Sequence, residues 1–288
     1  MTDDLLSSSE SVTVDVALSG PDWQLQTRLS VPTGPTRLRQ LLPLIQIFTD
    51  AVVDSTVQVT AGQGQTISCS EGCGACCRQL VAISEVEARH IGALVDALPE
   101  PRRSAIRNRF DEAHHRLEEA GLLEELRYPE QWTDGQGRSL GLQYFQQGIP
   151  CPFLEEESCS IYADRPLACR EYLVTSPAED CASPTAATVQ CVTLPLKVWS
   201  AVARFDPVPP SVRCIRWVPL ILAPAWAHAH PDEPAPRPGP DVLRELFDHL
   251  TSPKAAPVQP AYLPCDQQAG SVLAEADSST GGTPYGSS

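Results

Sequence analysis

Residues 69–77 read CSEGCGACC and place four cysteines within nine positions. These cysteines, Cys69, Cys73, Cys76 and Cys77, have the spacing C-x3-C-x2-C-C. A second set lies downstream, at Cys151, Cys159, Cys169 and Cys181. No histidine lies inside either set, so the metal ligands that the two sets offer are cysteine sulfur atoms. We expect both sets to lie on loops that a helical core brings together.

The spacing within the sets favours a soft metal ion. The step from Cys73 to Cys76 suits a turn that aims two thiolates at one ion, and Gly72 and Gly74 let the backbone turn tightly near sulfur. Neighbouring side chains diverge in helix or strand, so Cys76 and Cys77 either serve different ions or one of them lies outside the ligand shell. Thiolates favour zinc or iron, including an iron–sulfur cluster, over magnesium or calcium. Eight thiols permit two four-sulfur sites without requiring them.

The composition limits which partners the protein can bind and in which compartment we expect it. The chain has 288 residues and a formal net charge of −15, which argues against binding nucleic acid or an anionic membrane, because both require a basic surface. The acidic N-terminus lacks a signal-peptide core, and the most apolar later stretch, residues 217–227, is too short to span a membrane and contains two prolines. We therefore expect a soluble, cytoplasmic protein that binds a metal ion. No protein partner can be named from the sequence.

The number of cysteines also bears on their role. The chain has eleven, an odd number that fits poorly with complete disulfide pairing, and cytosolic cysteine clusters are more often metal-binding or catalytic than structural bridges. Redox-active disulfides and incidental buried thiols are the alternatives. Cys191 is a further candidate for the second set, whereas Cys214 and Cys265 show no relation to either set.

Patterns outside the cysteine sets predict an α+β fold that is mainly helical. Residues 12–31 alternate between apolar and polar around SGPD, which predicts an N-terminal β-hairpin. Ser84 and Glu87 form a capping box that marks a helix start. Residues 132–139 are predicted as a turn, and the Pro-rich stretch 228–240 as irregular. Apolar residues at helical spacing predict helices at 36–57, 85–98, 101–120, 140–148, 194–205 and 240–250.

We therefore expect a helical core with cysteine-rich metal-binding loops and a disordered C-terminal tail. The tail is rich in Pro, Ser, Gly and Thr and has little to bury. The predicted segments are the N-terminal β-hairpin and helix at 1–60, the cysteine-cluster domain at 61–195, a C-terminal helical extension at 196–251 and the tail at 252–288.

Positively charged side chains flank both cysteine sets. Four thiolates on Zn²⁺ carry a net negative charge, so Arg78, Arg165 and Arg170 could stabilise a metal–thiolate site. Alternatively, Arg165 and Arg170 pair with carboxylates such as Asp164 or Glu171, as surface charges commonly do. The sequence leaves both interpretations open.

Taken together, the two sets resemble the YkgJ-like cysteine-cluster family. The shared elements, in order from Cys69 to Cys181, are C-x3-C-x2-C-C, C-x-F-L, C-S-I-Y, R-P-x-x-C-R and a closing cysteine. The family's domain is described as zinc- or iron-chelating, so the resemblance implies that these cysteines hold zinc or iron. It gives no functional meaning to the first and last parts of the chain.

Three classes of function stay open. The first is a metal-binding protein whose two cysteine sets hold zinc or iron in a structural or metal-handling role. The second is an iron–sulfur-dependent enzyme that modifies proteins with S-adenosylmethionine, by analogy with the flagellin lysine methylase, which carries a similar cluster. Against it, the chain lacks a glycine-rich strand-to-helix loop for a nucleotide. The third is redox sensing through Cys76 and Cys77 or through the C-x2-C step from Cys73 to Cys76, although the sequence lacks the βαβ pattern of a thioredoxin-like site. No catalytic or cofactor-binding residue can be named.

Overall fold

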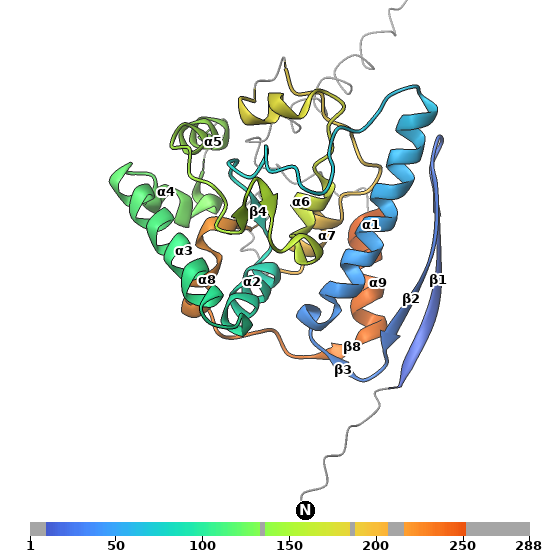
Figure 1. Ribbon diagram of the computed structural model, residues 1–288. Coiled ribbons are helices and arrows are strands. Elements are labelled where there is room, and N and C mark those ends of the chain that lie inside the picture. The colour runs from blue at the N-terminus through green and yellow to red at the C-terminus, as the bar shows by residue number, and fades with distance from the viewer. Residues whose placement is uncertain (1–9, 133–135, 185–187, 207–215, 252–288) are drawn as a thin grey trace, which may run out of the picture.

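Helices dominate the computed structural model of the protein, which describes residues 10–132, 136–184, 188–206 and 216–251 (Figure 1). An antiparallel hairpin precedes the helices, so the fold is α+β and mainly helical, as the sequence predicts. The predicted tail at 252–288 lies outside the described residues. Within the described part of the chain, no helix is long and apolar enough to cross a membrane.

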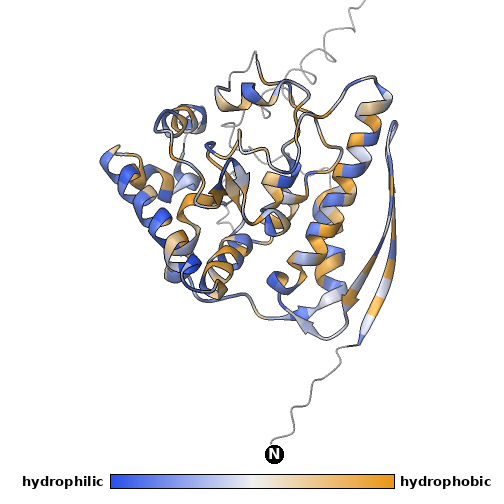
Figure 2. Ribbon diagram, in the orientation of Figure 1, coloured by the Kyte–Doolittle hydropathy of each residue, from blue (hydrophilic) through white to orange (hydrophobic). Residues whose placement is uncertain are grey.

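The predicted hairpin is confirmed. β1 (Ser11–Ser19) pairs antiparallel with β2 (Gln24–Pro32), and Val14 lies opposite Leu29. Figure 2 shows hydrophilic and hydrophobic residues alternating along both strands. This period places Leu25, Leu29 and Val31 on the buried face of β2, against α1 and α9.

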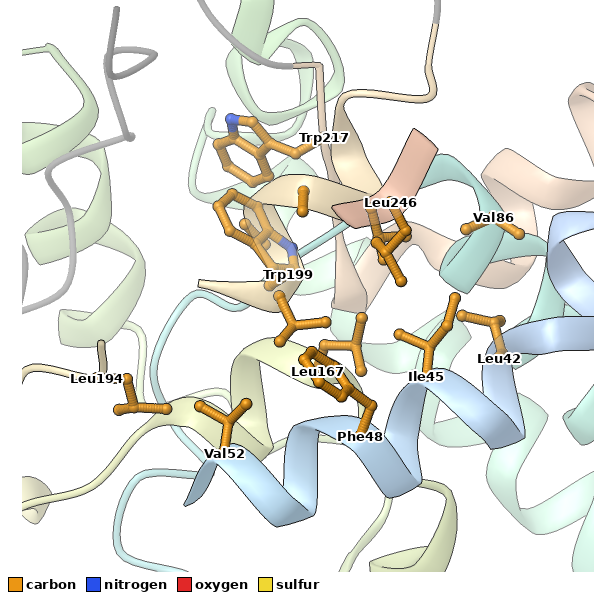
Figure 3. Close-up of a cluster of buried hydrophobic side chains, with 14 of the residues drawn as sticks. Leu42, Ile45, Phe48, Val52, Val86, Leu167, Leu194, Trp199, Trp217 and Leu246 are labelled. Atoms are coloured by element: carbon orange, nitrogen blue, oxygen red, sulfur yellow. The ribbon is translucent and has the colours of Figure 1, made fainter. Parts of the chain in front are cut away.

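The long helix α1 (Leu38–Gly62) forms the centre of the core. It begins two residues later and ends five residues later than the predicted helix at 36–57, and Pro43 lies inside it. Its buried stripe repeats every three or four residues, as expected for a helix with one apolar face. Figure 3 shows this stripe directed toward Leu167, Trp199 and Leu246, and its labelled members are Leu42, Ile45, Phe48 and Val52.

Helices occupy most of the chain between the two cysteine sets. The capping box before α2 (Glu85–Ala97) is confirmed, because Ser84 and Glu87 bond each other's backbone N–H groups. Pro101 precedes α3 (Arg102–Glu119), as predicted. α5 (Gln136–Gln146) begins four residues before the predicted helix at 140–148, so the turn predicted at 132–139 is wrong for residues 136–139, where Gly137 lies against the Trp132 ring. Between α3 and α5 lie α4 (Leu123–Arg127) and the 3₁₀ helix η1 (Pro129–Gln131).

Short elements build the second half of the chain. The helix predicted at 194–205 is limited to α7 (Val198–Ala203). Lys197, the residue before it, has φ −104° and ψ 87°, outside the helical region, and proline at position 195 disfavours helix at the residue before it. The Pro-rich stretch, predicted as irregular, contributes the short strand β8 (Arg237–Pro238), which pairs with β3 (Pro35–Thr36). The other elements are β4 (Ala82–Ile83), β5 (Leu154–Glu155), β6 (Ser158–Cys159), η2 (Tyr162–Asp164), α6 (Leu167–Glu171), η3 (Ala178–Ala182), β7 (Val218–Pro219), η4 (Leu220–Leu222), α8 (Ala223–Ala229) and α9 (Gly239–Thr251).

The largest core cluster joins segments that are distant in sequence. It contains Leu42, Leu167 and Leu246, which belong to the predicted segments 1–60, 61–195 and 196–251 respectively. These side chains lie close together in Figure 3. The division of the chain at these boundaries stays a prediction.

Three buried carboxylates connect α2, α6 and α7. Glu87 in α2 accepts a hydrogen bond from the first residue of α6 at 2.7 Å, and Glu171 in α6 accepts one from the second residue of α7 at 2.8 Å. Asp206, just after α7, accepts one from the first residue of α2 at 2.9 Å, which closes the circle. The N–H groups in the first turn of a helix lack partners within it, so these carboxylates satisfy them. We call α2, α6, α7 and the three carboxylates the helix ring.

Candidate metal centre

The first cysteine set lies on an irregular loop between α1 and β4. Cys77 N donates to the Gly74 carbonyl at 2.9 Å, which folds the loop into a tight turn. Ser68 N donates to the Val174 carbonyl at 2.9 Å and fixes the start of the loop to the segment after α6. Gly72 has a φ of +88°, a left-handed conformation that favours glycine. The predicted tight backbone near sulfur is therefore present.

The second set is distributed over four short segments. Glu156 and Glu157 form the turn between β5 and β6, with φ values of 50° and 59°. Two left-handed residues give a turn whose twist matches that of the two strands. Cys151 precedes β5, Cys159 lies in β6, Cys169 lies in α6, and Cys181 lies in η3.

The β5–β6 hairpin packs directly against the first loop. Cys151 N donates to the Cys77 carbonyl at 2.7 Å, a backbone contact between the two sets. A Cβ atom on Gly74 would lie 2.5 Å from the Glu157 carbonyl oxygen and 2.6 Å from Leu154 Cδ1. Only glycine permits this approach, so Gly74 allows the two sets to meet.

A cavity of about 370 Å³ opens beside α1 at the meeting point of the two sets. Val53 and Val57 of α1 give it an apolar wall, and Tyr162 and Tyr172 add aromatic surface. Five of the eight predicted ligands line it: Cys69, Cys73, Cys76, Cys169 and Cys181. The cavity therefore combines thiols from both sets.

Burial raises the pKa of most of these thiols. It raises the pKa of Cys151 to about 12 and that of Cys181 to about 11. A hydrogen bond with the Cys77 thiol, and then burial, raises the pKa of Cys76 far above its usual range. Burial also raises the pKa of Cys69, Cys159 and Cys169. At neutral pH these thiols hold protons in the metal-free protein, and a metal ion must displace them.

Charge interactions divide the thiols into two groups around Cys76. The first group is Cys69, Cys73 and Cys181, because negative charge on Cys73 raises the pKa of the other two. The second group is Cys151, Cys159 and Cys169, which interact with one another in the same way. Charge on Cys76 raises the pKa of thiols in both groups, so Cys76 lies between them.

The thiols are neighbours without forming a closed ligand shell. As they stand, no three Cys, His, Asp or Glu side chains among the described residues are close enough to hold one ion. Binding an ion therefore requires the loops to draw their thiols inward. The donor chemistry fits zinc or iron, because both groups offer only partly or fully buried sulfur.

The three arginines that flank the sets differ in their partners. Arg78 pairs with Glu157 through contacts of 2.6 and 3.0 Å. Arg170 pairs with Asp50 of α1 through two contacts of 2.8 Å, rather than with Glu171. The Arg165 guanidinium stacks on Tyr162, with its Cζ atom 3.7 Å from the ring centre.

Sequence reasoning missed two polar residues beside the first group. Tyr172 Oη lies 4.0 Å from Cys181 Sγ, and Gln79 Nε2 donates to Tyr172 Oη and to the Cys181 carbonyl at 3.4 Å. Both residues follow a cysteine of the sets within three positions, which is the signal that could have identified them. Their contacts tie the first loop to η3.

Cys191 also lies near the first group. It forms an isolated antiparallel bridge with Val174 and packs in the same small cluster as Cys69 and Cys181. Cys191 is disulfide-bonded, whereas the eight predicted ligands are free thiols. The eight are thus available for an ion in the described structure.

The comparisons with known proteins identify one family. Residues 68–191 match the family model CxxCxxCC, described as "Putative zinc- or iron-chelating domain". The matched segment contains all eight predicted ligands and is less than half of the chain. No curated protein and no solved structure gave a significant match. The predicted resemblance to a cysteine-cluster family is therefore confirmed for this segment.

Proposed function

We propose that all eight cysteines of the two sets are metal ligands, because residues 68–191 match the family model described as "Putative zinc- or iron-chelating domain". The observation that carries the proposal is the gathering of five cysteines from both sets around one cavity. The role that we propose is structural or metal-handling, in the cytoplasm, where the eight free thiols can stay reduced. All-sulfur ligation leaves no open position of the kind that catalytic zinc sites keep.

The two groups suggest two ions. We assign Cys69, Cys73 and Cys181 to one ion and Cys151, Cys159 and Cys169 to the other. Cys76 and Cys77 then supply the fourth ligand of each site. Adjacent side chains diverge, which suits ligation of two ions. Cys76 interacts with both groups, so its loss should affect both sites.

The alternative is an iron–sulfur-dependent enzyme that uses S-adenosylmethionine. The family description covers iron as well as zinc, so metal identity separates the two candidates. Neither the comparisons nor a contact among the described residues favours this alternative. We therefore place it second.

The deciding experiment is the metal and acid-labile sulfide content of anaerobically purified protein, with its visible spectrum. The proposed role predicts a colourless protein with two zinc ions per chain, or iron without sulfide. Stoichiometric iron and sulfide with a brown colour would favour the enzyme. Wild-type protein without bound metal, which also fails to take up zinc or iron, would overturn the proposal.

Cysteine variants test the assignment of ligands. Cys181→Ser should lose one ion and Cys76→Ser should weaken both, because Cys76 lies between the groups. Cys265→Ser is the matched control, since Cys265 belongs to neither set. Equal metal content in the Cys76, Cys181 and Cys265 variants would contradict the assignment.

A further inference from the structure

Two of the three arginines near the cysteines already have charged partners. Arg78 donates through both terminal nitrogens to the Glu157 carboxylate. Arg170 pairs with Asp50 through two 2.8 Å contacts, and its side chain is only 5% exposed. Because their positive charges are offset by carboxylates, these two arginines contribute little net charge to the thiols.

Arg165 differs from both. Its side chain makes no hydrogen bond or ion pair with any residue that the structure describes, and its Nε atom is buried without a partner. Leaving a guanidinium group unpaired in a partly buried site is costly unless negative charge is nearby. The Tyr162 ring supports the guanidinium from one face, which fixes its direction.

Arg165 lies beside thiols of both groups. It lines the cavity of about 370 Å³ together with Cys69, Cys73 and Cys181 of the first group and Cys169 of the second. The guanidinium therefore lies where two metal–thiolate sites would concentrate negative charge.

A second arginine holds Arg165 in place. Arg170 Nε donates to the Arg165 carbonyl at 2.9 Å, and another nitrogen of Arg170 donates to the Ala163 carbonyl. Arg170 thereby fastens the segment before α6 to Asp50 of α1. The two arginines of the R-P-x-x-C-R element therefore differ. Arg170 binds backbone carbonyls, whereas the charge of Arg165 is unpaired among the described residues.

We propose that Arg165 is the counter-charge of the metal–thiolate centre, and that Arg170 positions it. Four thiolates around a divalent ion carry two net negative charges, and two such sites repel each other at close range. A guanidinium between them reduces this repulsion without acting as a ligand. This inference rests on the proposed function.

The test compares zinc affinity, measured by chelator competition, among full-length variants. Arg165→Gln should bind zinc about 10- to 100-fold more weakly, the range found for residues that support metal ligands from outside the ligand shell. Arg165→Lys keeps the charge and should recover most of the affinity. Arg28→Gln is the matched control, because Arg28 is paired with Asp15 on the β1–β2 hairpin, outside both cysteine sets, and it should bind like wild type.

The outcomes separate this inference from the proposed function. Zinc binding by wild type with equal affinity in Arg165→Gln and Arg28→Gln would overturn the counter-charge alone. A lysine variant as weak as the glutamine variant would also overturn it, because charge would then not be the cause. Absence of zinc and iron binding by wild type would overturn both proposals. If Arg165→Gln does not fold, Arg165→Lys still tests the charge, because an affinity about 10-fold or more below that of wild type would overturn the counter-charge.

Discussion

The helix ring and the two cysteine loops handle buried polar groups in opposite ways. In the ring, Glu87, Glu171 and Asp206 each accept a hydrogen bond from the backbone of a neighbouring helix. In the loops, burial raises the pKa of thiols such as Cys151 and Cys169, and no three of the described side chains close on an ion. The ring is complete without a ligand, whereas the loops have donors that only a metal ion would satisfy together.

The two regions meet in α6. Cys169 lies in this helix, two residues before Glu171, and Glu87 accepts from the first N–H of the same helix. The ring therefore fixes the position of Cys169 before any ion binds. The first loop and the β5–β6 hairpin reach this thiol from either side. We infer that the ring is a preformed base and that metal binding completes the loops.

The largest effect on the free energy of unfolding is expected from a substitution of Asp206, whose buried carboxyl group belongs to the helix ring. Burial, and then the charge of Glu85, raises the pKa of Asp206 from 3.8 to about 8, while the unfolded chain keeps a value near 3.9. Between these pH values the folded protein holds a proton that the unfolded chain has lost. The contribution of Asp206 to the free energy of unfolding is therefore full below about pH 4 and falls as the pH rises to about 8.

Asp206→Asn tests this dependence. Asparagine has no proton to lose and keeps an oxygen that can accept from Glu85 N. Relative to wild type, its free energy of unfolding should increase by a few kcal/mol between about pH 5 and pH 8. Urea unfolding of both proteins with a chelator present measures the difference. A difference that does not change with pH would contradict the raised pKa.

A smaller loss of stability is expected from Glu87→Ala. The substitution leaves three buried donors without their acceptor, namely Leu167 N, Ser84 N and the Ser84 hydroxyl. Unsatisfied buried groups are costly, so the free energy of unfolding should fall by about 3 kcal/mol. The loss should appear with and without metal, because the ring needs no ion.

The matched control is Glu118→Ala on the exposed face of α3. It should change the free energy of unfolding by no more than about 0.5 kcal/mol. Urea unfolding of both variants, with zinc and with chelator, makes the comparison. If Glu87→Ala were costly only in the zinc-loaded protein, the ring would depend on the metal and the contrast between the two regions would fail.

Sequence patterns predicted the elements whose cause is local. The alternation in 12–31, the stripe of α1 and the capping box at Ser84 each depend on neighbouring residues, and each is confirmed. The helix predicted at 194–205 was too long, because Lys197 lies outside the helical region and α7 begins only at Val198. Pro195 is the local signal that could have shortened the prediction.

The candidate site was predictable in composition but not in arrangement. The spacing of the cysteines and the family resemblance identified the ligand type. Which thiols are neighbours depends on the packing of the β5–β6 hairpin against the first loop, a contact between residues about 80 positions apart in the chain. The partners of Arg78, Arg165 and Arg170 likewise became distinct only in the folded chain.

The smallest effect on the free energy of unfolding is expected from Gly74→Ala, at the contact between the first loop and the β5–β6 hairpin. An alanine Cβ would lie 2.5 Å from the Glu157 carbonyl oxygen, so the hairpin must shift away. In zinc-loaded protein this overpacking should cost about 1–3 kcal/mol of the free energy of unfolding. In chelated protein the cost should be smaller, because loops that no ion holds together can separate. Gly34→Ala is the control, since its Cβ meets no atom within 4 Å. An equal cost for Gly74→Ala with and without zinc would mean that the loops are joined independently of metal.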